Sequence, residues 1–350
     1  MNTEKLQAAL NKLGEPSYRY RQIALAVYRD LAESFGGIKT IPQTLRQELT
    51  QLVPFDDLVL KTEQRSHDGS IKKLFLTRDG LAVESVLMKH DDGRRTVCVS
   101  TEAGCQINCS FCATGHLGFE RTLTASEIVG QVLSFARELK AAGEKVTNVV
   151  FMGMGEPFLN YDNVKKAILL LNDSAGFNLG QRHISVSTSG IVPGIERFAA
   201  EDWQVNLAVS LHAPNDVLRS RLMPINTTYP LEQLLPALDS YIATTNRRLM
   251  VEYLLLGGIN DSPDEAGALA DLLHAYRHVS RLNMVNLIIY NPARDSYGHW
   301  DPFRAPGPAA LTAFEEVLTG KGIAWTRRVS FGGDISGACG QLAGTENHRN

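Results

Sequence analysis

The chain has 350 residues, of which 44% are hydrophobic and 21% are charged, a balance typical of a globular protein with a large core. The net charge of −3 and the pI near 6.3 exclude a protein that is strongly basic throughout, so any contact with nucleic acid must come from local patches. No apolar run reaches membrane-spanning length, and the first residues lack a secretion-signal pattern, so we expect a cytoplasmic protein with no membrane partner.

The first 55 residues predict a small helical accessory domain. Apolar residues recur at helical spacing in three short runs, and Gly and Pro separate the runs. The runs cover residues 6–13, 23–31 and 45–52. Within this unit, residues 18–21 alternate tyrosine and arginine, which suits stacking on unpaired bases. Three arginine pairs are further candidates for RNA contact, although such pairs are more often solvated surface: Arg94–Arg95, Arg247–Arg248 and Arg327–Arg328.

Residues 56–92 predict a β-hairpin extension. Alternating runs at 71–77 and 81–88 flank an Asp-Gly turn, which is a common two-residue hairpin signal. Glu84 lies on the second run. Its carboxylate either faces solvent or is a buried acid whose pKa is raised.

From about residue 93 to residue 345 strands and helices alternate. Six successive β-α units imply a parallel sheet with right-handed crossovers, and we expect a partial (β/α)6 barrel of the α/β class, with an open doubly wound sheet as the alternative. The predicted strands cover residues 96–100, 146–152, 183–188, 205–211, 249–256 and 284–290, with a seventh at 323–329. The predicted helices cover residues 124–142, 160–172, 191–200, 231–244, 263–276 and 308–320.

Three of the five cysteines, Cys105, Cys109 and Cys112, follow the first predicted barrel strand. Their spacing is typical of ligands to an iron–sulfur cluster, and three thiolates leave one iron of a cubane open to another ligand. The alternative is a structural zinc site completed by His116.

Polar and glycine-rich segments follow the later strands, at the end of the barrel where active sites lie. Individually, their glycines could serve turns, their serines could cap helices and His212 could be structural, but their shared position beside the cysteine loop favours a site. The segments are residues 153–157, 187–190, 210–214 and 290–292.

The remaining cysteines lie on the first barrel strand, Cys98, and in a glycine-rich loop near the end of the chain, Cys339. A free cysteine is usually a small buried hydrophobe, and that interpretation stays open for both.

These motifs together resemble the RlmN and Cfr family of RNA adenine methyltransferases, which are radical S-adenosylmethionine enzymes. The resemblance covers nearly the whole chain. It rests on five motifs that occur in order: Gly104–Gly115 with its three cysteines, Phe151–Pro157, Ser187–Gly190, Ser210–Asp216 and Ala338–Gly344.

The resemblance implies a [4Fe-4S] cluster on Cys105, Cys109 and Cys112, with S-adenosylmethionine on its open iron. Motif by motif, it assigns seven residues to S-adenosylmethionine: Gly155, Glu156, Ser187, Ser210, Leu211, His212 and Asn291. Two molecules of S-adenosylmethionine would be used per turnover.

The resemblance also implies a covalent route. One S-adenosylmethionine methylates Cys339, and a radical derived from the second activates that methyl group for addition to adenine. Glu84 would accept the base proton, and Cys98 would release the product by forming a disulfide bond with Cys339.

The branch of the family determines which adenine carbon is methylated. The RlmN branch methylates carbon 2 of an adenosine in 23S rRNA and often in tRNA, whereas the Cfr branch methylates carbon 8; this sequence is closer to RlmN but departs from it at Phe331 and at Ser336–Gly337. A monomer that receives electrons from a flavodoxin-type or ferredoxin-type donor is expected. Alternatives from other classes are a non-catalytic iron–sulfur protein and a zinc-stabilised RNA-binding module.

Overall fold

A ten-stranded sheet organises the computed structural model, which describes residues 1–292 and 302–344. The sheet order is β1-β2-β3-β4-β7-β8-β9-β10-β11-β12. From β4 onward neighbouring strands are parallel. The structure therefore confirms the predicted partial α/β barrel. The predicted domain end at residue 345 lies outside the described ranges.

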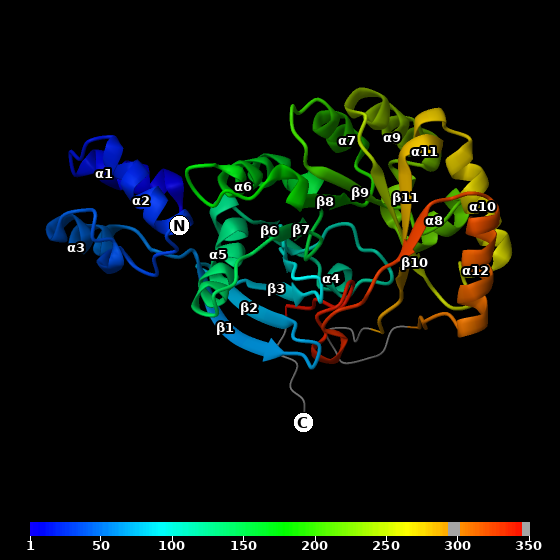
Figure 1. Ribbon diagram of the computed structural model, residues 1–350, viewed down its shortest axis with the longest axis horizontal. Coiled ribbons are helices and arrows are strands. Elements are labelled where there is room, and N and C mark those ends of the chain that lie inside the picture. Colours follow the sequence, from blue (N-terminus) through cyan, green and yellow to red (C-terminus); the bar gives the residue numbers. More distant parts are fainter. Residues whose placement is uncertain (293–301, 345–350) are drawn as a thin grey trace.

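Every predicted barrel strand and helix is present, with its ends shifted by a few residues. The strands are β4 (Arg95–Cys98), β7 (Asn148–Phe151), β8 (Ile184–Thr188), β9 (Asn206–Ser210), β10 (Leu249–Leu255), β11 (Asn283–Ile289) and β12 (Trp325–Arg327). The main covering helices are α5 (Ala125–Ala141), α6 (Tyr161–Asn172), α7 (Val192–Ala199), α9 (Leu231–Thr245), α10 (Pro263–His274) and α12 (Pro308–Gly320). Figure 1 shows these helices outside the strands, where their apolar faces bury the sheet.

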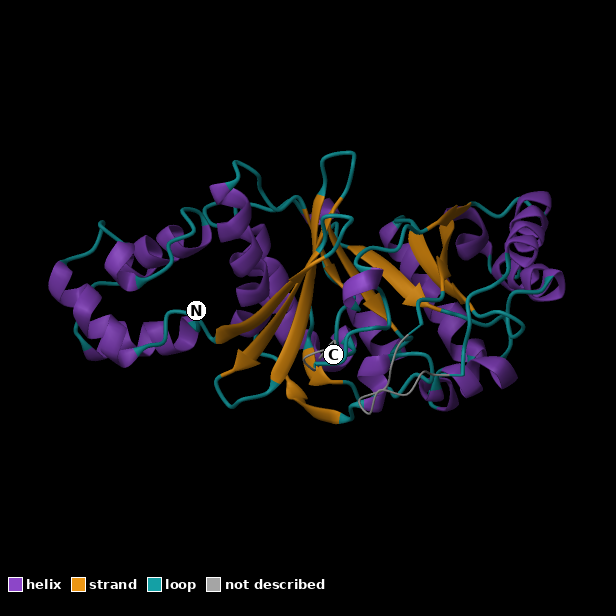
Figure 2. Ribbon diagram, turned by 90° about the horizontal axis from the view of Figure 1, so that it is seen from below, coloured by secondary structure: helices purple, strands orange, loops and turns teal. Residues whose placement is uncertain are grey.

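The antiparallel extension has three strands, whereas the sequence predicted a two-stranded hairpin. These strands are β1 (Leu58–Arg65), β2 (Ile71–Thr77) and β3 (Ala82–Lys89). The additional strand, β1, is an exposed edge with little apolar alternation, so its pattern was weak. Because β3 pairs with β4, with Val86 opposite Cys98, the extension is continuous with the barrel sheet. Figure 2 shows the strands running from one part into the other.

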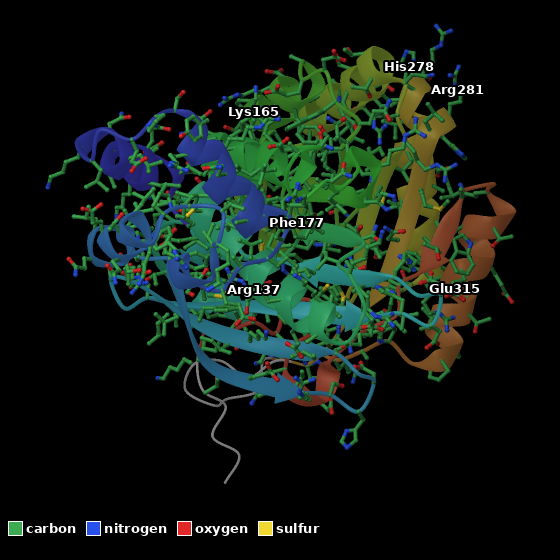
Figure 3. All side chains as sticks on the ribbon, turned by 60° about the vertical axis from the view of Figure 1, so that its left-hand side comes forward. Arg137, Lys165, Phe177, His278, Arg281 and Glu315 are labelled. Atoms are coloured by element: carbon green, nitrogen blue, oxygen red, sulfur yellow. The ribbon has the colours of Figure 1, made fainter. Side chains whose placement is uncertain are left out.

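The three predicted N-terminal helices lie to one side of the barrel (Figures 1 and 2). They are α1 (Thr3–Lys12), α2 (Tyr18–Tyr28) and α3 (Gln43–Leu52). Arg137 of α5, labelled in Figure 3, forms an ion pair of 2.9 Å with Asp56, which follows α3. This contact joins the segment that directly follows the helical unit to the barrel, next to the predicted boundary at residue 55. The division into three domains stays a prediction.

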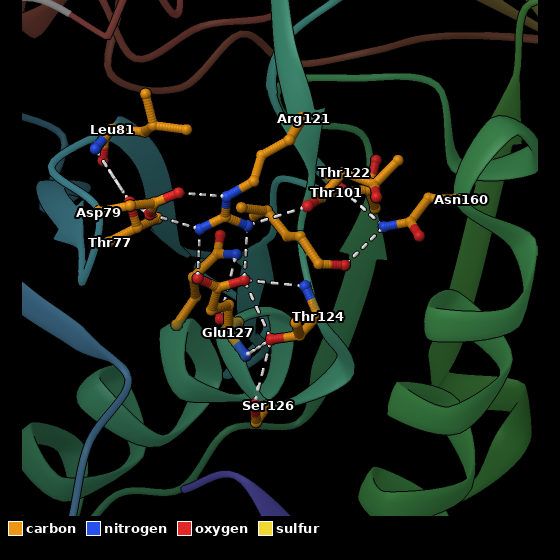
Figure 4. Close-up of polar contacts among 12 residues, drawn as sticks. Thr77, Asp79, Leu81, Thr101, Arg121, Thr122, Thr124, Ser126, Glu127 and Asn160 are labelled. Atoms are coloured by element: carbon orange, nitrogen blue, oxygen red, sulfur yellow. Dashed lines mark hydrogen bonds and ion pairs between the residues drawn. The ribbon is translucent and has the colours of Figure 1, made fainter. Parts of the chain in front are cut away.

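A polar network fixes the extension on the barrel (Figure 4). Arg121 donates to Asp79, in the turn between β2 and β3, at 2.7 Å and to Glu127, in the first turn of α5, at 2.8 Å. Thr124 and Glu127 form a capping box that satisfies the first amides of α5. The turn, the segment before α5 and α5 itself are therefore held as one unit.

Short elements complete the described ranges. They are β5 (Glu102–Gly104), α4 (Ala113–His116), β6 (Phe119–Thr122), α8 (Asp216–Leu222), α11 (Arg277–Leu282) and the 3-10 turns Phe35–Gly37, Pro157–Asn160, Gln181–His183, Pro224–Thr227 and Gly333–Ile335. None of the helices in the described part of the chain is long and apolar enough to cross a membrane.

Candidate active site

The cysteine loop leaves the barrel through β5 and returns through β6. Gly104 has a φ of +78°, and a Cβ there would lie 2.0 Å from the carbonyl oxygen of Gly118. Only glycine therefore allows the amide of Cys105 to donate to that oxygen at 2.8 Å. The amide of Cys112 donates to the carbonyl of Cys109 at 3.1 Å, which turns the loop back on itself.

Burial raises the pKa of all three loop thiols, and repulsion between the thiolates contributes to the rise for Cys109 and for Cys105, whose pKa is about 12. Three grouped thiolates in such a place need a bound cation. Among the described residues, no three His, Cys, Asp or Glu side chains converge on a point where one metal ion would fit. A cubane cluster has a separate iron for each cysteine, so the arrangement fits a cluster better than one zinc ion.

His116, the fourth ligand of the zinc alternative, does not join the cysteines. Its Nε2 lies 3.2 Å from the carbonyl oxygen of Ser110 and the side chain is exposed. The zinc interpretation therefore lacks its fourth ligand.

A cavity opens beside the cysteine loop at the carboxyl ends of the strands. The space free of protein atoms in and at the mouth of this cavity is about 950 Å³, which is sufficient for a cofactor-sized molecule. Eight of the predicted metal and cofactor residues line it: Cys105, Cys109, Cys112, Gly155, Glu156, Ser187, Ser210 and His212.

Gly155 and Glu156 shape one wall of this cavity. Gly155 has a φ of +98°, and a Cβ there would lie 2.5 Å from the Cβ of Glu102. The buried carboxylate of Glu156 accepts hydrogen bonds from the amides of Phe158 at 2.9 Å and Ser189 at 2.7 Å. Glu156 therefore ties the ends of β7 and β8 together, and burial raises its pKa.

His212 forms another part of the wall and is neutral. Burial and nearby Arg219 lower its pKa to about 3, and its Nδ1 accepts from the amide of Leu254 at 3.0 Å. The proton must therefore be on Nε2. Leu211, although predicted to bind the cofactor, is buried in the core and lines neither cavity described here.

Arg219 is a site residue that sequence reasoning missed. It is fully buried and donates to the carbonyls of Ser189 at 2.7 Å, Ser210 at 3.1 Å and Leu211 at 3.2 Å. These bonds hold the ends of β8 and β9 in place. An arginine in a short polar helix resembles surface in a sequence, so no pattern pointed to this role.

Two buried polar atoms near the cavity have bonding capacity for a ligand. Among the described residues, the Nδ2 of Asn291 has no hydrogen-bond partner, and the hydroxyl of Ser189, which lines the cavity, has only the carboxylate of Glu156 within reach. A buried polar group normally has a partner, so a polar ligand that bonded these atoms would satisfy them. Together with the buried thiols, this fits a cluster and S-adenosylmethionine; Asn291 lies outside the cavity lining itself.

A second cavity of about 670 Å³ lies next to the first. Cys98 lines the second cavity only, whereas Cys339 lines both. The pKa of Cys98 is raised to about 12, chiefly by burial, and nearby Arg328 partly offsets this rise. All five cysteines are free thiols, so the expected disulfide bond between Cys98 and Cys339 is not present in this structure.

Arg328 is another site residue that was not identified. It lines both cavities and lies 3.5 Å from the carboxylate of Glu252, which lines the first. The sequence offered Arg328 only as half of an arginine pair that was a candidate for RNA contact or for solvated surface. Arg327, the last residue of β12, pairs with Glu315 at 2.7 Å. Because side chains alternate along a strand, the next residue, Arg328, points the other way, toward the cavities.

Glu84 is not brought to the cavities. It is buried, and its carboxylate forms an ion pair of 2.9 Å with Lys72 and accepts from the amides of Ala343 and Gly344 at 2.8 and 3.1 Å. It does not line either of the two cavities described above. Of the two options for this carboxylate, burial is confirmed and exposure is wrong.

Comparison with known proteins identifies the family of the chain. Residues 99–273, half of the chain, match the model of the radical SAM superfamily. Proteins named "Probable dual-specificity RNA methyltransferase RlmN" are 46% identical in Chloroflexus aurantiacus, over 98% of this chain and 91% of the relative, and 44% identical in Symbiobacterium thermophilum, over 98% and 90%.

A solved structure agrees. A radical SAM methyltransferase from Sphaerobacter thermophilus matches with a TM-score of 0.92 and 45% identity, over 99% of this chain and 98% of that chain. The family implies a [4Fe-4S] cluster and S-adenosylmethionine, and the thiols and cavity fit both. The chain belongs to the RlmN family of radical SAM methyltransferases.

Proposed function

We propose that this enzyme methylates carbon 2 of an adenosine in 23S rRNA and in tRNA, with Cys339 as the carrier of the methyl group. The observation that carries the proposal is the place of Cys339, which lines both the cavity of the cluster cysteines and the cavity of Cys98. A carrier must meet a methyl donor on one side and a substrate on the other. The names of the relatives support RNA as the substrate.

The chemistry explains why a carrier is needed. Carbon 2 of adenine is electron-poor and does not attack a methyl sulfonium by displacement, whereas a cysteine sulfur does. When bound, the cluster and two S-adenosylmethionine molecules per turnover supply the methyl group and the one-electron chemistry. Gly155, Glu156, Ser187, Ser210, Leu211, His212 and Asn291 are the residues we propose to hold S-adenosylmethionine, Leu211 and Asn291 from outside the cavity lining.

The residues of the chain then act in sequence. Cys339 gains the methyl group as its S–H proton is lost. The bound cofactors would take one hydrogen atom from that methyl group, and its carbon then bonds to the base. The adduct loses one proton, and the one electron that it also loses would return to the cluster, which supplied one electron at the start. The Cys98 thiolate attacks the sulfur of Cys339, the S–S bond forms as the S–C bond breaks, and the released carbon takes up a proton. A dithiol reductant then returns two electrons to the disulfide.

Glu84 is the proposed acceptor of the base proton. Its oxygens are engaged by Lys72, Ala343 and Gly344, so this role requires the segment around Ala343 to move away. Cys98 needs no such movement, because it already lines the same cavity as Cys339.

Anaerobic reconstitution followed by mapping of methyladenosine isomers tests the function. We expect about four irons per chain, cleavage of S-adenosylmethionine to 5′-deoxyadenosine, and 2-methyladenosine in 23S rRNA and tRNA transcripts. 8-Methyladenosine would instead place the enzyme with the Cfr branch. A colourless zinc protein that leaves RNA unmodified would overturn the proposal.

Two cysteine variants separate the steps. Cys98→Ala should accumulate a protein–RNA crosslink through Cys339, because the S–C bond cannot be broken. Cys339→Ala should bind S-adenosylmethionine but transfer no methyl group. Full methylation by Cys339→Ala, measured by mass spectrometry of the RNA, would exclude the carrier role.

Two finer expectations belong to the same proposal. The electron donor is of the flavodoxin or ferredoxin type, and the enzyme acts as a monomer. Reduction of the cluster by each purified donor, and light scattering of the reconstituted enzyme, test them.

A further inference from the structure

A buried ion pair in the antiparallel extension lies beneath the loop that carries Cys339. Lys72 of β2 and Glu84 of β3 are 4% and 1% exposed, and Lys72 Nζ lies 2.9 Å from Glu84 Oε1. Neither side chain lines the cofactor cavity or the cavity next to it. The pair therefore lies outside the reacting space in this structure.

Both members of the pair also bond the chain on either side of Cys339. Lys72 Nζ donates to the carbonyl of Ser336 at 3.3 Å, three residues before the cysteine. Glu84 Oε2 accepts from the amides of Ala343 and Gly344, four and five residues after it. One ion pair thus contacts both flanks of the loop.

Stability alone does not account for this pair. Burying two charges costs desolvation energy, and an apolar pair of similar volume is usually no less stable. What an apolar pair could not do is hold three backbone groups of a loop that otherwise has little regular structure. The charges thus provide directional bonds to the loop.

The other contacts of the loop show what the pair contributes. On the cluster side, the amide of Ala113 donates to the carbonyl of Gly340 at 2.8 Å, and Thr114 Oγ1 donates to that of Leu342 at 2.6 Å. On the side of the extension, Asp68 accepts from the amide of Gly332 at 2.7 Å. Lys72 and Glu84 complete the attachment from beneath, on both flanks of Cys339.

We propose that Lys72 and Glu84 are positioning residues that hold the sulfur of Cys339 between the two cavities. The proposal rests on the carrier role of Cys339 proposed above. It assigns the antiparallel extension a function in catalysis, as the platform of the carrier loop. It also gives Glu84 a role before the base reacts, in addition to any role as proton acceptor.

The chain offers a matched control one residue away. Lys73 is 3% exposed and forms an ion pair of 2.9 Å with Glu138, on the other face of β2. Lys73→Met therefore removes a buried cation from the same strand without touching the Cys339 loop. The double variant Lys72→Met/Glu84→Met replaces the ion pair by an apolar pair, which should restore stability but not the bonds to the loop.

Two measurements on the full chain test the proposal. The first is hydrogen exchange of the Ala343 and Gly344 amides in the cluster-free protein. The second is the methylated fraction of Cys339 in the reconstituted enzyme, from intact mass. For Lys72→Met and for the double variant we expect at least tenfold faster exchange and at least tenfold slower methylation of Cys339, with Lys73→Met like wild type.

Glu84→Gln separates positioning from proton transfer. If Glu84 were a proton acceptor only, Cys339 would be methylated at the wild-type rate and RNA would remain crosslinked; we expect slower methylation instead. Wild-type exchange and methylation in both Lys72 variants would overturn the proposal. If wild-type Cys339 itself is never methylated, the carrier role fails, and the exchange rates still decide whether the ion pair holds the loop.

Discussion

Single charged residues set the properties of the thiols in this site. Cys98 lies in an environment that disfavours its thiolate, and Arg328, which lines both cavities, is the cation that opposes this effect. Arg219 acts on the backbone instead, because its guanidinium donates hydrogen bonds to three carbonyl oxygens. In both cases a cation, buried for Arg219 and half-buried for Arg328, contacts groups that come from distant parts of the sequence.

Replacement of Arg328 should slow the chemistry of Cys98. Loss of the positive charge in Arg328→Met raises the pKa of Cys98 further, and a rise of one pKa unit would slow the reaction of Cys98 as a thiolate about tenfold at fixed pH. The check is the pH dependence of Cys98 alkylation. Arg327→Met is the control, because Arg327 pairs with Glu315 and lines neither cavity. An unchanged alkylation profile for Arg328→Met would show that its charge does not act on Cys98.

At the scale of elements, periodicity predicted nearly all of the fold. The apolar runs located the seven parallel strands and the six main covering helices, because buried parallel strands and amphipathic helices leave strong patterns. The polar edge strand β1 left a weak pattern, and the short elements β5, β6, α4, α8 and α11 were not predicted. Likewise, short-range motifs identified the cavity residues, whereas Arg219 and Lys72 act through contacts with residues far along the chain, which no local pattern reports.

The capping box of α5 gives a prediction at this scale. Thr124→Ala removes the side-chain acceptor of the Glu127 amide, and we expect a loss of about 1 kcal/mol in the free energy of unfolding. Urea denaturation of the cluster-free protein measures it. Thr124→Ser keeps the hydroxyl and should recover most of the loss; equal losses in both variants would show that the cap is not the cause.

For the molecule as a whole, the site lowers stability in the absence of its cofactors. Three half-buried thiols lie with the buried carboxyls of Glu102 and Glu156, and desolvation raises the pKa of each of the five groups. Desolvation of these groups lowers the free energy of unfolding of the cluster-free protein. Ligands that bind only the folded state raise that free energy again.

The buried carboxyl of Glu102 makes the free energy of unfolding of the cluster-free protein depend on pH. Its pKa is about 7 when folded against 4.5 for the free group, so its contribution to stability is fully present below about pH 4.5 and is lost as pH rises through 7. Over that window the loss is at most about 3 kcal/mol. Glu102→Gln should flatten the corresponding part of the stability profile of the cluster-free protein, measured by urea denaturation from pH 4.5 to 8. An identical slope in the variant would assign the dependence to other groups.

The contact between Lys72 and Ser336 spans 264 residues of sequence, and this separation has a consequence for the order of folding. At a synthesis rate of about 5 to 20 residues per second, the strand with Lys72 is synthesised roughly 13 to 50 s before the loop with Ser336 and Cys339. The strands of the antiparallel extension can therefore pair with those of the barrel before Cys339 is synthesised. Attachment of the loop, which closes the longest contacts in this part of the molecule, should be among the last events of folding.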